Sequence, residues 1–337
     1  MTLATGPGME TLGPKIFLLI IILPAGIPWL VQAFTPYLSL FYLGRVVSCL
    51  IYTALGPVVA VLIAEISEPR IRGLLLSVEE ITVAVGQLAI YVMAHSLPWD
   101  VATAVCAAPM ILVASLTFFV PEIKQLAKPQ NYRPVLLLTA VFILRELGGQ
   151  YVVFSYTVYL FRKAGVGLDA FVCTVLVGVV RLVFTVVGAA IVDRVGRRPL
   201  LIATSLVCGA AEVVGAVFLL VDVPGSSWVP LAAVMIFVSS YGLGIGPIPW
   251  ALMGELIPTP VRSVGSSVCN LNFSMFSFII SFVFPYLLEI GLGSAFLVFA
   301  SANAILTLML CAFLPETCGK SLSDLEDTFK SSPGQSE

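Results

Sequence analysis

Long apolar segments with almost no charge inside them follow one another along nearly the whole of this 337-residue chain. Hydrophobic residues make up 59% of the sequence and charged residues 11%, whereas soluble domains have about 25% charged residues. Such a chain needs a lipid bilayer as its solvent, because each run of about 20 apolar residues can cross the hydrocarbon core as a helix. The runs are continuously apolar rather than alternating, which argues against a transmembrane barrel. We therefore predict an all-α polytopic membrane protein.

Ten transmembrane helices are expected from these segments. Their approximate bounds are 16–34, 42–63, 74–95, 99–120, 134–160, 170–192, 199–221, 228–253, 263–289 and 292–314. The longest internal polar stretch separates four of them from six. This predicts an N-terminal bundle at 1–120, a short cytoplasmic linker at 121–133, a C-terminal bundle at 134–314 and a cytoplasmic tail at 315–337.

The loop lysines and arginines predict the orientation of the chain. One set of alternate loops and ends carries nearly all of them: Lys15, Arg70, Arg72, Lys124, Lys128, Arg133, Arg194, Arg197, Arg198, Arg262, Lys320 and Lys330. The opposite side has only Arg162 and Lys163. Because positive loops stay in the cytoplasm, both termini should be cytoplasmic. We expect an integral membrane protein, in the plasma membrane.

Several functional classes lack support in the sequence. It has no metal-ligand cluster, no phosphate-binding loop and no nucleophile elbow, so we expect neither enzyme activity nor a metal or other cofactor. A net charge of −2 without a basic tract gives no reason to expect nucleic acid. The expected partners are the lipid bilayer and a small-molecule solute.

Short motifs at the ends of the apolar segments carry a family resemblance. They are LGRVVSC at 43–49, AEISEPRIRG at 64–73, PE at 121–122, VDRVGRRPLL at 192–201, GPIPW at 246–250 and PETCGKSL at 315–322. In combination they resemble the sugar-porter branch of the major facilitator superfamily, in particular the facilitated trehalose transporters and related hexose carriers of arthropods. The resemblance covers nearly the whole chain.

The resemblance implies a major facilitator fold and a transport function. It implies that a sugar of the trehalose or hexose class, or a related small solute, binds near the midplane between two bundles and crosses by alternating access. Family members have twelve helices, and the resemblance aligns the start of this chain with the third, so the N-terminal bundle is expected to be incomplete, with about 10 of 12 helices. A truncated protein that transports nothing is the alternative.

Charged motifs at the cytoplasmic side are candidates for gating. An ion-pair network is expected between the DRVGRR loop and the residues after GPIPW, because arginine pairs bidentately with carboxylates. By the resemblance, the gating residues are Glu65, Arg70, Arg72, Asp193, Arg194, Arg197, Arg198, Glu255, Arg262 and Glu316. The simpler alternative is that these charges only set topology, although that does not explain the carboxylates. Pro247 and Pro249 should let their helix bend, and Trp250 resembles the family's aromatic lid under the sugar.

Charged residues also lie inside the predicted spans. Arg145 is eleven residues beyond Pro134, which places it about 16 Å into the bilayer at 1.5 Å per residue. Arg181, Glu146 and Glu212 lie at comparable depth. Each charge costs at least ~2.5 to 3.5 kcal/mol there, so it should face a cavity or a partner.

The resemblance places most of these charges in the sugar site. The family's QQxSGxN motif and its two tyrosines correspond here to RELGGQYVVFSY at 145–156. The implied substrate-binding residues are Glu80, Arg145, Glu146, Gln150, Tyr151, Tyr156, Arg181, Trp250 and Asn272. Guanidinium and carboxylate groups replace amides at four of these positions, namely 80, 145, 146 and 181. Three interpretations follow: the charges pair structurally, with Arg145 held by Glu146 or Glu212; the arginines bind an anionic solute; or a protonatable glutamate couples transport to protons.

Overall fold

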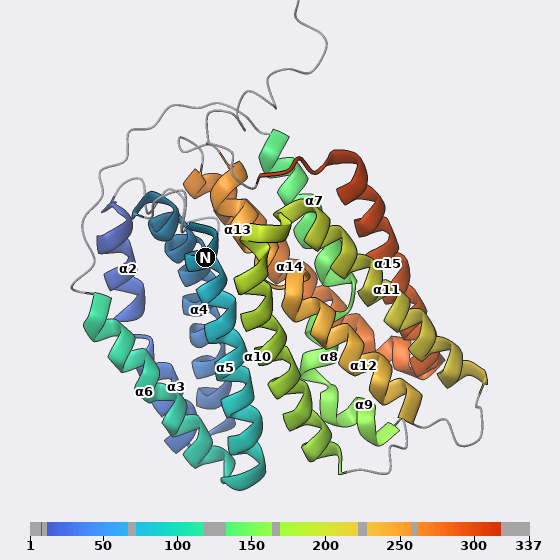
Figure 1. Ribbon diagram of the computed structural model, residues 1–337. Coiled ribbons are helices and arrows are strands. Elements are labelled where there is room, and N and C mark those ends of the chain that lie inside the picture. The colour runs from blue at the N-terminus through green and yellow to red at the C-terminus, as the bar shows by residue number, and fades with distance from the viewer. Residues whose placement is uncertain are drawn as a thin grey trace, which may run out of the picture.

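The computed structural model of the chain describes residues 8, 12–66, 72–117, 133–163, 169–221, 228–257 and 262–317. In these residues every regular element is a helix (Figure 1). Residues 121–132 of the predicted linker at 121–133, and residues 318–337 of the predicted tail, lie outside the described residues.

The first four expected spans form five helices. They are α2 (Pro14–Ile22), α3 (Gly26–Phe34), α4 (Leu38–Ile66), α5 (Arg72–Ser96) and α6 (Trp99–Thr117). A turn at 23–25 divides the first span into α2 and α3. Pro24 lies in this turn, and proline cannot supply the backbone donor that a continuous helix needs. α3 packs against α4 and α6.

The remaining six spans form a larger group of elements. They are α7 (Arg133–Leu147), α8 (Gln150–Ser155), α9 (Thr157–Lys163), α10 (Ala170–Val195), α11 (Arg197–Val221), α12 (Trp228–Ser240), the π-helical turn η1 (Tyr241–Ile245), α13 (Pro247–Leu256), α14 (Arg262–Ile290) and α15 (Leu292–Phe313). Two single predicted spans are therefore interrupted helices. The first breaks at Gly148 and Gly149, where Gly149 has a positive φ of 75° that favours glycine.

The second interruption lies in the glycine- and proline-rich segment. Five residues, Tyr241–Ile245, form the π-helical turn, and α13 then starts with Pro247 as its first residue. A Cβ at Gly242 would lie 3.0 Å from the Arg181 carbonyl oxygen, so the glycine permits close approach to α10. The segment just before the two prolines therefore departs from a regular α-helix at a π-turn, a feature often found at functional sites.

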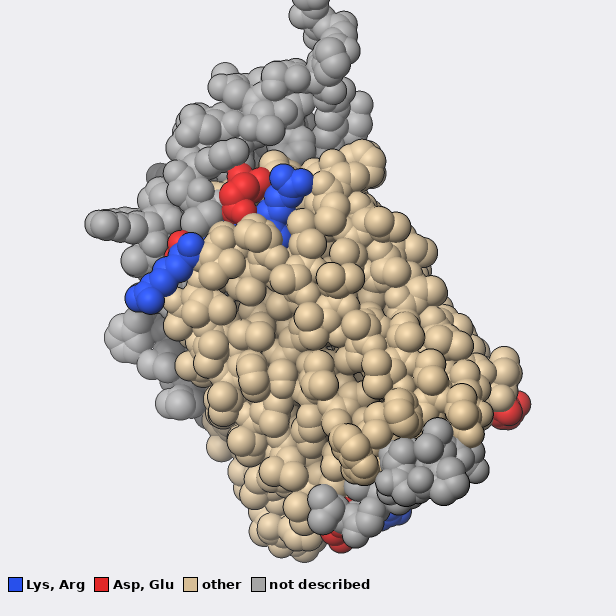
Figure 2. Space-filling model, turned by 45° about the vertical axis from the view of Figure 1, so that its right-hand side comes forward, with Lys and Arg blue, Asp and Glu red and all other residues tan. Residues whose placement is uncertain are grey.

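Seven helical stretches among the described residues are long and apolar enough to cross a membrane: Lys15–Phe34, Leu38–Gly56, Ala170–Val195, Arg197–Val221, Trp228–Leu256, Val264–Ile290 and Leu292–Phe313. The other three expected spans are also helical, as α5, α6 and α7 to α9. α5 contains Arg72, Glu79 and Glu80, and the span from α7 is divided into short helices, so neither is a continuous apolar rod. On the face seen in Figure 2, a broad band free of charge separates charged side chains at the two ends.

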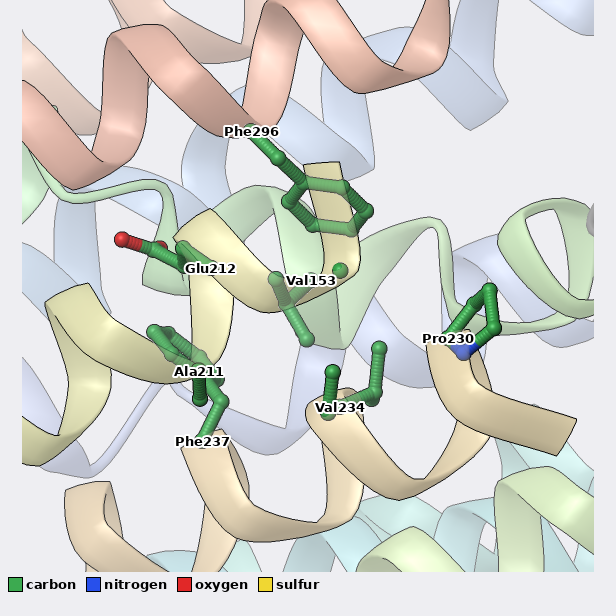
Figure 3. Close-up of a pocket in the computed structure, with 9 residues that line it drawn as sticks. Val153, Ala211, Glu212, Pro230, Val234, Phe237 and Phe296 are labelled. Carbon is green, nitrogen blue, oxygen red and sulfur yellow. The ribbon is translucent and has the colours of Figure 1, made fainter. Parts of the chain in front are cut away.

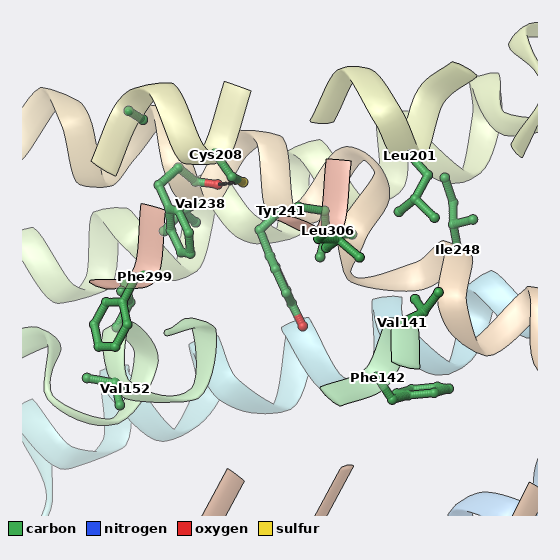
Figure 4. Packing of buried hydrophobic residues seen from close by; sticks show 14 of the residues in the cluster. Val141, Phe142, Val152, Leu201, Cys208, Val238, Tyr241, Ile248, Phe299 and Leu306 are labelled. Carbon is green, nitrogen blue, oxygen red and sulfur yellow. Dashed lines mark hydrogen bonds between the residues drawn. The ribbon is translucent and has the colours of Figure 1, made fainter. Parts of the chain in front are cut away.

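Among the described residues, the hydrophobic core is larger in the second group of helices than in the first. The large cluster lies in α7 to α15 and includes Phe142, Leu201, Ile248 and Phe299, which are spread along its interior (Figure 4). The first group has a smaller cluster of Phe17, Leu18, Ile21, Ala54 and Val58. The two groups meet where α5 packs against α10 and α13, and where α4 packs against α14 and α13.

Candidate functional site

Charged side chains from both groups of helices meet at the junction between them. Glu80 of α5 and Arg181 of α10 form an ion pair with Arg181 Nη2 2.5 Å from Glu80 Oε1. Arg181 also donates to the Gln87 side chain of α5. Both ion-pair partners are buried, with 5% of each residue exposed. This pair therefore joins the two groups through a strong contact in a dry environment.

A second buried pair lies on α7 beside the first. Arg145 Nη1 is 3.3 Å from Glu146 Oε1, and the other carboxylate oxygen of Glu146 accepts from Ser277 of α14 at 2.7 Å. Arg145 Nη2 donates to the Tyr241 hydroxyl at 2.5 Å, and Arg145 Nε donates to the Ile245 carbonyl at 3.1 Å. The guanidinium thus satisfies the carbonyl at the end of the π-turn.

Tyr241 connects the two ion pairs. Its hydroxyl lies 3.5 Å from Glu80 Oε1 while it accepts from Arg145. Figure 4 shows the ring extending away from Cys208 and Val238, with the hydroxyl at its far end. We call the group of Glu80, Arg145, Glu146, Arg181 and Tyr241 the central cluster.

Aromatic rings surround the guanidinium of Arg145. Its Cζ lies 5.5 to 5.9 Å from the centroids of four rings, those of Phe142, Tyr241, Trp250 and Phe273. Trp250 contacts Phe142 and Phe273 edge to face at centroid distances of 4.9 and 5.3 Å. Cation–π attraction is strongest in such a desolvated setting, so Arg145 is held firmly between these rings.

The other predicted substrate-binding residues differ in their surroundings. Gln150 is buried at the start of α8, and neither its amide nitrogen nor its amide oxygen has a hydrogen-bond partner in the described part of the chain. Tyr151 is 47% exposed, and Tyr156 packs against Phe284 with ring centroids 5.0 Å apart. The Asn272 amide donates to the Val268 carbonyl of its own helix at 2.9 Å. The central cluster and Trp250 therefore come together, and the two tyrosines and Asn272 lie in other contacts.

A second charged group joins four segments near the end of α10 and the start of α11. Arg197 at the start of α11 contacts Asp193 of α10 at 2.9 Å and Glu255 of α13 at 3.0 Å. Thr317, which follows α15, donates its hydroxyl to Glu255 at 2.8 Å. The predicted contact between the DRVGRR loop and Glu255 is therefore present. We call this group, with Glu316, the loop network.

Glu316 binds the first turn of α11 through the backbone. Its two carboxylate oxygens accept the backbone N–H groups of Arg197 and Arg198 at 3.0 and 3.2 Å. A carboxylate is favourable at a helix N-terminus, where four N–H groups lack helical partners. Gly196 has a φ of 98°, and a Cβ there would lie 2.8 Å from a Glu316 oxygen, so glycine makes room for this contact.

Other predicted gating residues have different positions. Arg198 donates to the Cys311 carbonyl of α15 at 2.7 Å, and Arg194 is exposed. The side chains of Glu65, Arg70, Arg72 and Arg262 lie outside the described residues. All contacts of the loop network given above lie within α10 to α15 and the residues that follow.

Comparison with known proteins places the chain in a family. The model of the family described as sugar (and other) transporter matches residues 2–125 and 122–329. The chain belongs to the sugar transporter family. It is an integral membrane protein, and the family is one of transporters rather than enzymes.

Its relatives include named sugar transporters. The chain is 27% identical to a facilitated trehalose transporter of Culex quinquefasciatus, covering 95% of this chain and 73% of that protein. It is 27% identical to the sugar transporter ERD6-like 6 of Arabidopsis thaliana, covering 97% and 79%. The chain spans about half of another such relative, 48% of the Anopheles gambiae trehalose transporter, at 28% identity.

Solved structures confirm the major facilitator fold of this family member. The proton:xylose symporter XylE bound to 6-bromo-6-deoxy-D-glucose superposes with a TM-score of 0.85 at 20% identity, covering 97% of this chain and 86% of XylE. The fucose:proton symporter FucP superposes with a TM-score of 0.70 at 16% identity, covering 92% of this chain and 86% of that structure.

Several residues of this transporter-family site were not predicted from the sequence. Tyr241, Gln87 and Ser277 contact the buried charges, and the Asn270 amide of α14 donates to the Thr53 carbonyl of α4 at 2.5 Å. Tyr241 is preceded by two serines and followed by glycine, a local polarity that could have marked it. A lone polar residue in an apolar helix gives no sign of its partner until the helices are packed.

Proposed function

We propose that this member of the sugar transporter family carries a small, neutral, polar solute of the sugar class across the bilayer by alternating access. The solute binds at the junction of the two groups of helices, at the central cluster and the neighbouring Trp250 and Gln150. Ligand sites of such transporters lie between the two halves, and Glu80 and Arg181 form an ion pair between the two groups of helices, which supports this location.

The observation that carries the choice of solute is the balance of charge. Arg181 has Glu80 as its partner and Arg145 has Glu146, so each buried guanidinium is matched by one carboxylate. Glu79, beside Glu80 on α5, adds a further carboxyl group. Among the described residues of the central cluster, no surplus positive charge is left to attract an anion. A neutral solute with hydroxyl groups is favoured over an anionic one.

Side chains suited to a sugar are present beside these pairs. The apolar faces of a pyranose ring pack on aromatic rings, which Trp250, Phe142 and Phe273 supply. The Gln150 amide can both donate to and accept from hydroxyl groups, and its two polar atoms have no partner in the described residues. A buried amide without partners costs free energy that a bound solute would recover.

The conformation described here is closed at this position. The Arg145 guanidinium fills the space between the four rings, and the Glu80–Arg181 pair joins the two groups of helices. Solute binding would therefore move the Arg145 side chain off the rings while its ion pair with Glu146 neutralises it. In this proposal the two ion pairs act as a closing contact, and not as counter-charges for the solute.

The loop network and the orientation of the chain complete the proposal. The network fixes the ends of α10, α11 and α13 relative to one another, so these helices would move as one body during transport. Arg262 would pair with the DRVGRR loop, and Glu65, Arg70 and Arg72 would form the corresponding gating charges of the first group of helices. The network would lie at the cytoplasmic side of the plasma membrane, with both termini on the same side.

Uptake into proteoliposomes tests this function. Purified chain is reconstituted, and entry of radiolabelled trehalose and D-glucose is compared with L-glucose, with glucuronate and with protein-free liposomes. We expect saturable, stereoselective entry of a neutral sugar, lost in Trp250→Ala and retained in Trp228→Ala, a control tryptophan that is 65% exposed. Uptake of glucuronate alone would replace this proposal with an anion carrier. Absence of any uptake by folded protein would favour the non-transporting alternative.

A further inference from the structure

A buried glutamate lies apart from the central cluster, among α11, α12 and α15. Glu212 of α11 is 3% exposed, and its Oε2 accepts from the Asn303 amide nitrogen of α15 at 2.8 Å. Asn303 is fully buried. In the described part of the chain, no lysine, arginine or histidine forms an ion pair with Glu212.

The surroundings of Glu212 are apolar. It borders a cavity of about 10 Å³, a volume near the minimum for one water molecule, and the other lining residues are apolar or glycine. Figure 3 shows Val153, Pro230, Val234 and Phe296 around this space, with the Glu212 carboxyl group directed away from Pro230 and Val234. An ionised carboxylate here would lack the partner that a buried charge needs.

Two oxygen atoms of the pair are also unsatisfied. Glu212 Oε1 and Asn303 Oδ1 are both buried, and neither has a hydrogen-bond partner in the described residues. Asn303 Oδ1 can only accept a hydrogen bond, and the same holds for Glu212 Oε1 as long as the carboxyl group is ionised. A carboxylic acid has one O–H donor, and the Asn303 amide has a carbonyl acceptor and two N–H donors, of which one already bonds Glu212 Oε2. One proton on Oε1 would therefore supply the donor that both orphaned acceptors require.

We propose that Glu212 is a proton-binding site that holds its proton at neutral pH, with the acid O–H directed to Asn303 Oδ1 and the Asn303 amide N–H directed to Oε2. The acid and the amide then satisfy each other through two hydrogen bonds. This site goes beyond the proposed solute transport and does not depend on it.

On the helices that line the cavity, the described neighbours of Glu212 include no second carboxyl group. On its own helix the nearest titratable group is Cys208, whose thiol donates to the Phe237 carbonyl at 3.5 Å. α12 contributes Pro230, Ala233, Val234 and Phe237 to the cavity, none of which titrates.

The remaining contacts connect the site to the interruption between α7 and α8. A Cβ at Gly148 would lie 2.9 Å from both polar atoms of the Asn303 amide, so Asn303 packs against that backbone. Arg145 and Glu146, one turn earlier on α7, pair with each other. The protonated pair thus braces the helix break next to the central cluster.

Infrared difference spectroscopy of purified protein tests the proton directly, because the carbonyl stretch of a carboxylic acid is separate from the bands of a carboxylate. We expect Glu212→Gln to remove a carboxylic acid band at neutral pH, and that band to shift when the wild-type protein is exchanged into D₂O. Glu289→Gln, at an exposed glutamate near the end of α14, should remove carboxylate bands instead. Loss of carboxylate bands alone in Glu212→Gln would overturn the proposal.

A second variant covers the case in which Glu212→Gln does not fold. Asn303→Leu has nearly the same shape and removes the acceptor for the acid proton. The acid band should then move to higher frequency than in wild type, as expected of a carbonyl group that has lost hydrogen bonds. An unchanged acid region in Asn303→Leu would also overturn the assignment of the proton to Glu212.

Discussion

Replacing Arg145 should lower the free energy of unfolding, because Arg145 makes several buried contacts in the central cluster. Arg145→Gln leaves the buried Glu146 carboxylate with only its Ser277 hydrogen bond, and it leaves the Ile245 carbonyl without its donor. Removing one partner of a buried ion pair typically costs ~3 to 5 kcal/mol. The loss of packing between four rings acts in the same direction. We therefore expect the free energy of unfolding to fall by about 3 to 5 kcal/mol.

The double variant separates the ion pair from packing. Glu146→Gln alone should also destabilise the protein, since Arg145 is then a buried cation without its carboxylate. Arg145→Gln combined with Glu146→Gln replaces two charges by two amides, so it should cost clearly less than the sum of the single changes, with a coupling free energy of about 0.5 to 3 kcal/mol.

Unfolding in mixed micelles, followed by tryptophan fluorescence, gives the three differences. Arg194→Gln serves as the matched control because Arg194 is exposed, and it should change stability by no more than about 0.5 kcal/mol. Additive effects of the two single variants would refute the reasoning. A fully stable Arg145→Gln protein that gains binding of a neutral sugar would show that Arg145 selects the solute instead of supporting the fold.

Further predictions concern the loop network, the junction and the topology. Glu255→Gln should lower the free energy of unfolding by about 1.5 to 3 kcal/mol, because the buried Arg197 loses one of its charged partners; chemical unfolding measures this, and an unchanged midpoint would contradict it. Arg181→Gln should make Thr53→Cys, introduced at the α4–α14 contact, react faster with a membrane-impermeant thiol reagent; an equal rate would show that the ion pair does not close the junction. A C-terminal tag should be labelled only after cells are permeabilised, and labelling of intact cells would reverse the orientation.

The positions of the helices could be predicted from sequence because the bilayer limits the alternatives. Apolar runs of about 20 residues have to be helical in lipid, and the described residues of all ten expected spans are helical apart from the interruptions given above. The interruptions were harder to predict. The π-turn at Tyr241–Ile245 and the break at Gly148 depend on contacts with Arg181, Thr204 and Asn303 from other helices, which no local pattern records.

The partners of the buried charges could be predicted only as alternatives. Glu146 and Glu212 were equally good candidates for Arg145, because both lie deep in the bilayer. The structure pairs Arg145 with Glu146 at 3.3 Å and places Glu212 beside Asn303. Depth along a helix is readable from the sequence, whereas the direction in which a side chain points depends on helix rotation and on packing.

The residues that the family pattern assigns to the site have different surroundings in the structure. Trp250 lies among aromatic rings next to Arg145. Tyr151 is at the family's asparagine position but is 47% exposed, while the adjacent Gln150 is buried. Both residues follow directly after Gly149, which has a positive φ and precedes α8. A single residue of register in a short helix therefore decides which side chain faces inward.

Equilibrium binding tests most directly whether a neutral sugar occupies the junction between the two groups of helices. Calorimetric titration of the purified chain with trehalose and D-glucose, with L-glucose and glucuronate as comparisons, requires no transport. We predict saturable binding of a neutral D-sugar that is lost in Gln150→Leu and retained in Gln32→Leu, a change at a buried glutamine of α3 that contacts Ser48. Binding of glucuronate in preference to every neutral sugar, or binding that Gln150→Leu leaves intact, would contradict the account.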